Sequence, residues 1–425
     1  MKFLHMADVH LGKYAYTNSA RYQDLFDAFA SAVQYGIQQE IDVLLVAGDL
    51  FDIRNVNSQI LFQTIRILER LKQKNIPVLA IEGNHDRALL KDGESWLAFL
   101  DNLGYLKLLS TPKDVKEEAL PKEAVYETET YRVVGLSYLG AATQKTLEGL
   151  RDPFLKADKF TIFMLHAGLS MVFSEEMAKL DKKVLLEYGD KVQYFALGHI
   201  HRQEVIADKI YMPGSLEYID MGEARRGDQK GFFLGEVDER GQCQVQFCPS
   251  HTRHYESVKI DASSAQNGGE LFQMALSQIE ASQIPCHSIV DVELTAENPS
   301  FDFGELDTAA LESALTELLE PVELYVHVPG SYEMTYETEP LDTFDKKQLE
   351  RQVVLDLLLE EKKLEEHSAL ALTNLALEAK DLVYKNEFQA QWLVDEVLQM
   401  AETMQNGPEE PGQDLLLEQQ KEETL

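Results

Sequence analysis

The chain has 425 residues, of which 39 are basic and 73 are acidic, giving a formal net charge of −34. Taken as one number, this charge argues against nucleic-acid binding, because a strongly acidic protein repels phosphate. A hydrophobic fraction of 44% excludes a chain that is disordered throughout, and three cysteines are too few for a disulfide framework.

The first half of the chain alternates short apolar runs with amphipathic stretches. Buried strands are predicted at residues 2–7, 42–49, 77–84, 161–168 and 194–201. Between the first three, apolar residues recur at helical spacing from Tyr22 to Val33 and from Ile60 to Leu71. Repeated strand–helix–strand order is typical of crossover connections on a mainly parallel sheet, so we predict an α/β sandwich.

A smaller unit with β-α-β-α-β order follows from about Tyr255. Three strands joined by tight turns are predicted just before it, at 209–215, 231–237 and 244–250. Within the smaller unit, strands are predicted at 256–261, 287–294 and 322–328, and helices around 266–281 and 307–319. Two long helices are predicted next, at 345–366 and 369–404, and an acidic tail follows them.

The negative charge is unevenly distributed along the chain. Residues 1–250 have a net charge of −7, from 29 basic and 36 acidic side chains, whereas residues 251–330 have −12 and residues 331–425 have −15. Such a shift marks a domain boundary near residue 250. We predict an α/β domain at 1–252, a small α+β domain at 253–330, a helical segment at 331–404 and a disordered acidic tail at 405–425.

Each predicted strand of the first half ends in polar residues of the same kinds. The motifs are Asp8-Val9-His10, Gly48-Asp49-Leu50-Phe51-Asp52, Gly83-Asn84-His85-Asp86, His166-Ala167-Gly168 and Gly198-His199-Ile200-His201. Sites in open α/β sheets form outside the carboxyl ends of the strands. A lone histidine such as His166 is more often a core residue than a ligand, but five such motifs in this order predict a metal site.

The residue types and spacing suit a centre with two divalent cations. Aspartate, asparagine and histidine supply the oxygen and imidazole ligands that Mn²⁺, Fe²⁺ or Zn²⁺ accept. In D-x-H and H-x-H, residues i and i+2 of an extended chain face the same side. The carboxylate of Asp49 can bridge two cations, and cations roughly 3.5–4 Å apart can hold a phosphate and a hydroxide for in-line attack.

The ordered set D-x-H, G-D, G-N-H-D, H and G-H-x-H resembles the calcineurin-like metallophosphoesterase superfamily. Within it, four stretches are similar to the SbcD family of bacterial DNA repair nucleases. They are LHMADVHLGK, AGDLFD, IEGNHD and PGSLEYIDMGEARRGDQKGF, the last at 213–232. The resemblance covers residues 1–250. It implies that residues 253–330 are a cap domain and that the C-terminal helices dock onto the coiled coil of an ATPase, SbcC.

The resemblance also assigns roles to individual residues. It implies that Asp8, His10, Asp49 and His201 hold one cation, and that Asp49, Asn84, His166 and His199 hold the second, with Mn²⁺ the usual metal. His85 is then a catalytic residue that binds no metal. It stabilises charge at phosphorus and protonates the leaving oxygen, and Asp52 or Asp86 orients it.

Three functional hypotheses remain open. The first is a metal-dependent DNA exonuclease or endonuclease, the nuclease subunit of an SbcCD-like ATPase–nuclease complex in DNA repair. The second is a phosphoesterase for another substrate, such as a phosphoprotein or a cyclic nucleotide. The third is a scaffolding subunit with weak catalysis. An apolar stripe in the first C-terminal helix either packs on the second helix or contacts a partner. Its members are Leu349, Val353, Leu357, Leu358 and Leu364.

Several further features give weaker expectations. Five arginines near the motifs either contact DNA or pair with neighbouring acids: Arg54, Arg87, Arg202, Arg225 and Arg226. We assign none of them to nucleic-acid binding. The resemblance implies a homodimer, for which residues 58–74 or 94–103 are candidates. No apolar run is long enough for a membrane span and the first residues do not predict a signal peptide, so a cytoplasmic protein is expected.

Overall fold

The computed structural model describes residues 1–15, 17–87, 94–109, 120–150, 156–169, 180–296, 302–329 and 372–377. The chain divides into two compact units, Met1–Ser331 and Tyr332–Leu425. In the second unit, residues 372–377 are helical. The rest of the predicted helices at 345–366 and 369–404, the apolar stripe and the tail at 405–425 lie outside the described residues.

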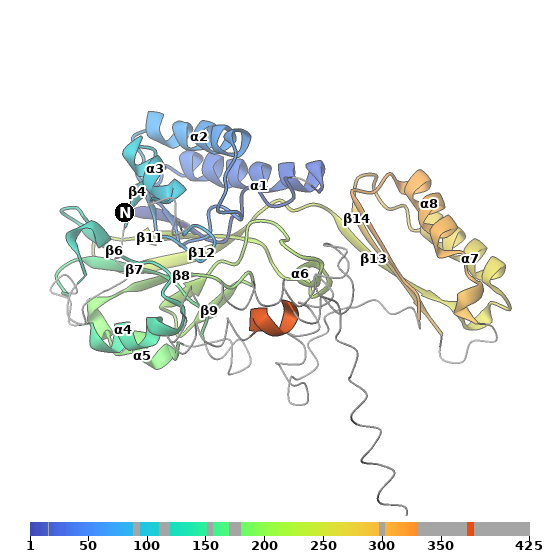
Figure 1. Cartoon of the computed structure of the whole chain (residues 1–425). Helices are drawn as coiled ribbons and strands as arrows, with labels where there is room; N and C mark the ends of the chain where they lie inside the picture. Colours follow the sequence, from blue (N-terminus) through green and yellow to red (C-terminus); the bar gives the residue numbers. More distant parts are fainter. Residues whose placement is uncertain are drawn as a thin grey trace, which may run out of the picture. The chain divides into compact units, whose positions relative to one another are not determined.

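The first unit contains a mixed sheet in the order β12-β11-β1-β2-β3-β4. Its strands are β1 (Lys2–Met6), β2 (Val43–Val46), β3 (Val78–Ala80), β4 (Lys107–Leu108), β11 (Gly231–Val237) and β12 (Cys243–Pro249). The first four run parallel, whereas β11 is antiparallel to β1 and to β12. Its helices are α1 (Ser19–Gln38), α2 (Ser58–Gln73) and α3 (Trp96–Asn102), which lie on one side of this sheet (Figure 1).

A second mixed sheet has the order β5-β6-β7-β8-β10-β9. Its strands are β5 (Val125–Glu127), β6 (Tyr131–Leu136), β7 (Phe160–His166), β8 (Tyr194–Gly198), β9 (Glu204–Ile206) and β10 (Ile210–Met212). The strands β6, β7, β8 and β10 run parallel, and β5 and β9 are antiparallel edges. The helices α4 (Thr143–Gly149) and α5 (Lys182–Leu186) cover its outer face (Figure 1).

The two sheets pack face to face because their strands are apolar on both sides. In β2, Val43 and Leu45 join the core between the sheets, whereas Leu44 and Val46 join the core beneath α1 to α3. Alternate residues of a strand point to opposite faces, so a continuous apolar run serves two cores. The predicted α/β sandwich is therefore confirmed.

One predicted connection is wrong. The strands β10 and β11 were expected to be neighbours joined by a tight turn, but they belong to different sheets. The segment between them contains the short helix α6 (Met221–Arg225). Turn residues in this segment, such as Gly214, suggest a hairpin, but pairing partners are chosen by burial across the whole sandwich. The predicted turn between β11 and β12 is present, at residues 238–242.

The remainder of the first unit has the β-α-β-α-β order expected from Tyr255 onward. Its elements are β13 (Tyr255–Asp261), α7 (Gly268–Ala281), β14 (Ile289–Thr295), α8 (Thr308–Leu319) and β15 (Glu323–His327). The three strands are parallel, and both helices cover one face of their sheet (Figure 1). Leu271, Leu311 and Leu315 of the helices are fully buried in its own core.

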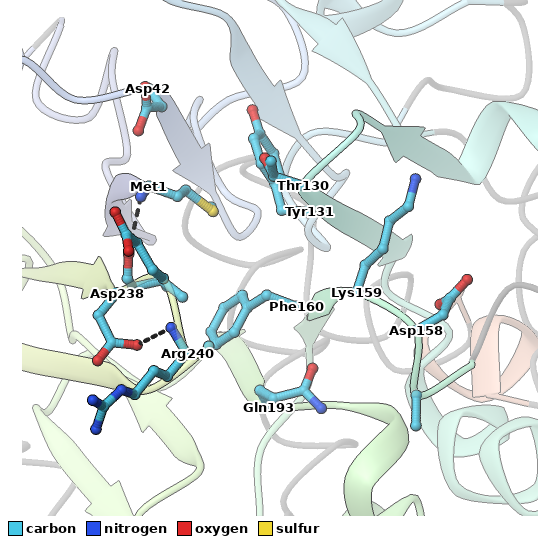
Figure 2. Close-up of a pocket in the computed structure, with 14 residues that line it drawn as sticks. Met1, Asp42, Thr130, Tyr131, Asp158, Lys159, Phe160, Gln193, Asp238 and Arg240 are labelled. Carbon is cyan, nitrogen blue, oxygen red and sulfur yellow. Dashed lines mark hydrogen bonds between the residues drawn. The ribbon is translucent and has the colours of Figure 1, made fainter.

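The opposite ends of the parallel strands differ in character. At the amino ends, a pocket of about 930 Å³ is lined by residues that include Met1, Asp42, Tyr131, Phe160 and Gln193 (Figure 2). The polar motifs of the sequence lie at the carboxyl ends instead. Across the described ranges, no helix combines the length and the apolar character needed to cross a membrane.

Candidate metal centre

The polar residues predicted at the strand ends lie together at the carboxyl edge of the two sheets. They follow β1, β2 and β3 of the first sheet and end or follow β7 and β8 of the second. The structure brings together all seven predicted ligands, Asp8, His10, Asp49, Asn84, His166, His199 and His201, and places His85 beside them. Packing of the two sheets unites residues that are up to 193 positions apart, from Asp8 to His201.

The backbone at four of these residues is in the left-handed region. The φ angles are 51° for Asp8, 51° for His10, 52° for Asp49 and 92° for His199. Residues with a Cβ rarely adopt such angles, and each costs on the order of 1–3 kcal/mol. The turns are held by hydrogen bonds such as that from the His199 backbone N–H to both Asp8 carboxylate oxygens, at 3.0 Å each.

Two glycines allow the strand ends to approach each other closely. A Cβ on Gly83 would lie 2.0 Å from Oδ1 of Asp49, and a Cβ on Gly198 would lie 2.2 Å from the carbonyl oxygen of Ala47. Both distances are far shorter than any van der Waals contact. The glycines in the G-N-H-D and G-H-x-H motifs are therefore required by packing around the site.

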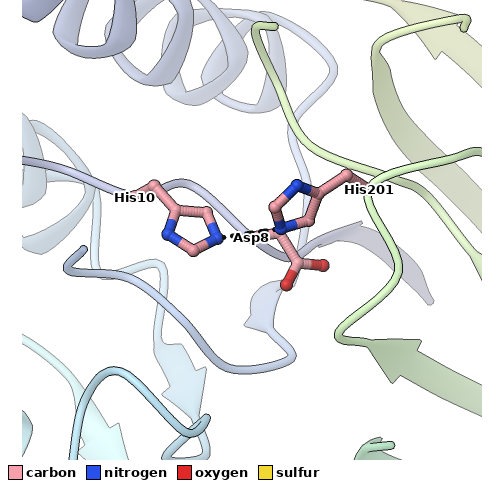
Figure 3. Close-up of side chains that lie close together, drawn as sticks. All are labelled: Asp8, His10 and His201. Carbon is pink, nitrogen blue, oxygen red and sulfur yellow. Dashed lines mark hydrogen bonds between the residues drawn. The ribbon is translucent and has the colours of Figure 1, made fainter. Parts of the chain in front are cut away.

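The first part of the site consists of Asp8, His10 and His201 (Figure 3). Each offers one ligand atom, and these atoms lie within 4.8 Å of one another. The Nε2 atoms of His10 and His201 are 3.1 Å apart. Asp8 and His10 are almost fully buried, so their ligand atoms face one another rather than solvent.

The second part of the site consists of Asp8, Asp49 and His166 with Asn84 and His199 beside them. Nε2 of His166 lies 3.2 Å from Oδ2 of Asp49 and 3.1 Å from Oδ1 of Asn84. The same asparagine oxygen lies 3.1 Å from Nδ1 of His199. Oδ2 of Asp49 also lies 3.9 Å from Nε2 of His10, so Asp49 stands between the two parts.

The donor set fits divalent cations because ring nitrogens with lone pairs face one another. Carboxylates and carbonyls only accept hydrogen bonds, so a ring nitrogen that contacts one must donate. Nδ1 of His10 contacts Asp52 at 2.9 Å, that of His201 contacts Glu223 at 2.6 Å, and that of His166 contacts the Ala47 carbonyl at 2.8 Å. In the neutral rings Nε2 then carries the lone pair, as in metal-binding histidines. Nε2 of His166 also contacts the Asp49 carboxylate, so without a cation it holds a proton there.

His85 has a different environment from these histidines. Its Nδ1 lies 2.7 Å from the backbone carbonyl oxygen of Asp52, and its backbone N–H donates to Oδ1 of Asp49 at 2.9 Å. Its ligand atoms also lie within 4.8 Å of those of His10 and Asp52, but these two are already hydrogen-bonded to each other. His85 is therefore beside the predicted metal ligands, and its Nδ1 is hydrogen-bonded to the main chain.

Of the two aspartates expected to orient His85, Asp52 contacts it through the main chain rather than through the carboxylate. The Asp52 carboxylate binds His10, and only the Asp52 main chain contacts His85. The Asp86 carboxylate is buried and accepts from the backbone N–H groups of Leu50, Phe51 and Gly83. Its role is to tie two strand-end loops together, since backbone N–H groups buried in a loop need an acceptor.

Burial and the neighbouring charges shift the pKa values of two histidines in opposite directions. Burial lowers the pKa of His199 to about 4, and the positive charge of His166 acts in the same direction. Burial also opposes protonation of His166, but the charge of Asp49 and its hydrogen bond outweigh it and raise the pKa of His166 to about 9. A cation and a proton therefore compete for Nε2 of His166.

Sequence reasoning missed Glu223, which lies on α6. One carboxylate oxygen contacts Nδ1 of His201, and the other accepts from Lys230 at 2.8 Å and from the Ile219 backbone N–H at 2.7 Å. Burial opposes ionisation of Glu223, but His201 and Lys230 lower its pKa to about 2. Glu223 occurs within the stretch 213–232 quoted above, where only its place in the folded chain distinguishes it from the neighbouring acids.

Most of the arginines near the motifs have partners within the chain. Arg202 pairs with Glu204, Arg226 with Asp228, and Arg225 with Asp291. Arg54 donates to the carbonyl of Asn84 at 3.4 Å, and the Arg87 guanidinium lies 6.0 Å from the ring of Tyr138. A pocket of about 400 Å³ beside His199 and His201 includes Arg202 and Arg226 together with Asp220, Glu223 and Asp228.

Comparison with known proteins gives a consistent result for the first half of the chain. Residues 1–203 match the calcineurin-like phosphoesterase family. The chain is similar to proteins named DNA double-strand break repair protein Mre11 from two archaea. It is 29% identical to the Saccharolobus solfataricus protein over 47% of this chain and 49% of that one, and 28% identical to the Archaeoglobus fulgidus protein over 66% of each chain.

A bacterial relative is similar over a comparable length. The uncharacterized metallophosphoesterase YhaO of Bacillus subtilis is 27% identical over 64% of this chain and 66% of that one. The alignments thus span about half to two thirds of the relatives' lengths. Metallophosphoesterases use divalent metals, and the clustered residues lie within or next to the matched region. Residues 1–203 therefore lie in a calcineurin-like metallophosphoesterase domain, whose homologues include Mre11 DNA repair proteins.

Proposed function

We propose that the chain is a metal-dependent DNA phosphodiesterase, an exonuclease or endonuclease of the SbcD type that acts in DNA repair. The observation that carries the proposal is the cluster of seven oxygen and nitrogen ligands with His85 beside it. The names of the archaeal relatives support DNA as the substrate. The stretch 213–232, which contains Glu223, supports the SbcD subtype.

We assign seven residues as ligands and one as the catalytic acid. Asp8, His10, Asp49 and His201 hold one cation, and Asp49, Asn84, His166 and His199 hold a second. The cations, in our proposal Mn²⁺, would supply Lewis acidity toward the phosphodiester and lower the pKa of water. His85 donates from Nδ1 to the Asp52 carbonyl, which leaves Nε2 as the ring nitrogen through which the protonated ring would protonate the leaving oxygen.

Substrate choice tests the proposal directly. Purified protein supplied with Mn²⁺ should degrade linear duplex ends or nick single-stranded DNA, and it should leave a phosphopeptide intact. The matched control is Asp49→Asn, which removes one negative charge between the two parts of the site and should abolish cleavage. Cleavage of the phosphopeptide with none of DNA would contradict the proposal.

A second candidate is a phosphoesterase for another substrate, such as a phosphoprotein or a cyclic nucleotide. The observation that favours it is the ion pairing of Arg202, Arg225 and Arg226, because paired arginines contribute little positive potential toward a DNA backbone. The phosphopeptide assay above, extended to cyclic nucleotides, separates the two candidates.

We further propose that the chain acts in the cytoplasm with a coiled-coil ATPase of the SbcC kind, bound through residues 331–404. The three cysteines are all free, which supports a reducing compartment. Deleting residues 340–425 should leave phosphodiesterase activity in place and abolish co-purification with the ATPase. Retention of the ATPase by the truncated chain would disprove this docking assignment and favour another surface.

A homodimer through α2 and α3 belongs to the same proposal. Phe62 on α2 is 61% exposed and Phe99 on α3 is 39% exposed, and large apolar side chains at a surface favour protein contacts. Phe62→Asp should shift the chain to a monomer in analytical ultracentrifugation. An unchanged sedimentation coefficient would show that α2 is not the interface.

A further inference from the structure

Glu223 and Lys230 form a buried ion pair whose hydrogen bonds converge on a predicted metal ligand. Glu223 is 1% exposed and Lys230 is 3% exposed. The ammonium of Lys230 donates to Glu223 at 2.8 Å, to the carbonyl oxygen of His201 at 2.8 Å and to the hydroxyl of Ser215 at 3.0 Å. All three of its protons are therefore used, one of them directly on His201.

The carboxylate of Glu223 holds the other side of the same histidine. Its Oε1 accepts from Nδ1 of His201 at 2.6 Å, and its Oε2 is held by Lys230 and by the Ile219 backbone N–H. The side chain of His201 is thus fixed through Glu223, and its main chain through Lys230. A carboxylate on Nδ1 forces the tautomer whose Nε2 lone pair is available to a metal.

The ion pair is not explained by stability alone. Removing two charges from water costs several kcal/mol for each ion, and apolar residues of similar volume often serve stability equally well. We propose that Glu223 is a positioning residue that fixes the tautomer and orientation of His201 for metal binding, and that Lys230 holds Glu223 in place. The inference rests on the proposed metal site, and it is independent of whether DNA is the substrate.

Glu217 offers a matched control six residues earlier in the same segment. It is also 1% exposed, it lies 3.3 Å from the guanidinium of Arg21, and it accepts from the backbone N–H groups of Tyr218 and Arg253 at 2.8 Å each. Among the residues that the structure describes, its hydrogen bonds and ion pairs involve none of the seven predicted ligands. Truncating either glutamate therefore breaks one buried ion pair, but of the two only Glu223 is hydrogen-bonded to a predicted metal ligand.

The test is calorimetric titration of the full-length chain with Mn²⁺ after removal of metal by a chelator. Glu223→Ala should lower the affinity for one of the two Mn²⁺ ions by about 10–100-fold and leave the affinity for the other unchanged. Electron paramagnetic resonance should then show the signal of an isolated Mn²⁺ ion in place of a coupled pair. Glu217→Ala should retain both affinities.

A second pair of variants keeps the test informative if alanine prevents folding. Glu223→Gln conserves volume, but its single oxygen cannot accept from both His201 and Lys230. It should therefore also lower the affinity for one Mn²⁺ ion, whereas Glu217→Gln should not. Unchanged binding in folded Glu223 variants would overturn the inference. Equal losses in the Glu217 variants would overturn it too. Wild-type protein that binds two ions but does not cleave DNA would disprove the proposed substrate and leave this inference intact.

Discussion

His85 differs from the neighbouring histidines in what its Nε2 contacts. Nε2 of His10 lies 3.1 Å from that of His201, and Nε2 of His166 lies 3.2 Å from Asp49. Within the described ranges, Nε2 of His85 makes no such contact, and its Nδ1 donates to the Asp52 main-chain carbonyl. The position of His85 is set by its backbone N–H, which donates to Asp49. In the proposed mechanism, this arrangement separates proton donation by His85 from metal binding by Asn84 within one loop.

We expect His85→Ala to lower kcat for DNA cleavage by about 10²–10⁴-fold, the usual contribution of general acid catalysis. Metal content should stay at the wild-type value. In the part of the chain that the structure describes, the ring of His85 is hydrogen-bonded to the Asp52 carbonyl and to none of the seven predicted ligands. Steady-state kinetics with metal analysis of the same sample measures both. His254→Ala, which alters an exposed histidine far along the chain, is the control. Loss of metal together with activity would show that His85 has a structural or ligand role.

The close packing around Gly83 gives a second prediction. Its φ is not in the left-handed region, so the effect of a methyl group there is purely steric. Because the added Cβ would lie 2.0 Å from Asp49 Oδ1 and 2.5 Å from Asp49 N, the carboxylate must move. We expect Gly83→Ala to abolish metal binding and to destabilise the fold by about 1–3 kcal/mol.

The matched control for this change is Gly269→Ala, near the start of α7, where the nearest atom would be 3.3 Å away. It should be neutral or slightly stabilising, since alanine favours a helix. Chemical denaturation and metal titration give both quantities. Normal Mn²⁺ affinity in Gly83→Ala would mean that Asp49 is not a ligand.

At the scale of elements, the short helix α6 connects two regions. Glu223 at its centre supports His201, and Arg225 at its end pairs with Asp291 of β14 at 2.7 Å. Tyr255 of β13 donates to the same aspartate, and Nε2 of His327 of β15 lies 2.7 Å from its carboxylate. Five residues of helix thus join the predicted metal site to the three-stranded sheet through hydrogen bonds and an ion pair.

This contact gives a prediction about pH. Burial opposes ionisation of Asp291, but hydrogen bonds from Arg225 and Tyr255 hold its pKa below the ordinary value of 3.8. A carboxyl whose folded-state pKa is lowered stabilises the fold fully above its unfolded pKa, and this contribution is lost as pH falls through the lower value. The stability difference between wild type and Asp291→Asn should be constant above about pH 5 and should shrink below about pH 4.

Urea unfolding of both proteins at a series of pH values measures this difference. Asp302→Asn is a suitable control, because Asp302 only caps a 3₁₀ turn and has no salt bridge in the described part of the chain. A difference that grows toward low pH would contradict the assignment of Asp291 as the charged partner of Arg225.

For the whole molecule, the net charge of −34 is divided in a way that matters for function. The residues up to 250 carry only −7, so two bound divalent cations would leave about −3 on that part. The cations would place positive charge where a phosphate approaches. The remaining −27 lies after residue 250 and suits a basic partner or solvation better than a DNA groove.

We therefore expect the isolated chain to bind DNA weakly without divalent cations and more tightly with them. Fluorescence anisotropy of a labelled duplex, titrated with the His85→Ala variant to prevent cleavage, measures this affinity. The cation-free complex should depend little on salt, since few phosphates are neutralised by protein side chains. A tight and strongly salt-sensitive complex in the absence of metal would contradict the prediction.

Much of the fold and the grouping of the ligands could be predicted because the strands are short, apolar and ended by distinctive residues. Runs such as 42–49 and 77–84 lie beside each other as β2 and β3, with Asp49 and Asn84 at adjacent ends. The sequence did not indicate β5 and β6, because short strands with charged neighbours lack a clear apolar period. It also misplaced the neighbours of β10, since strand pairing across two sheets is not a local property.

By itself, the sequence determined that polar motifs follow buried parallel strands and therefore gather at one edge of a sheet. Only the tertiary structure decided what each member of the group contacts. The assignment of Nδ1 partners to His10, His166 and His201, and the role of Glu223 beside His201, depend on distances between residues that are far apart in the chain. The physical reason is that strand periodicity acts over a few residues, whereas hydrogen-bond partners are selected where separate loops meet.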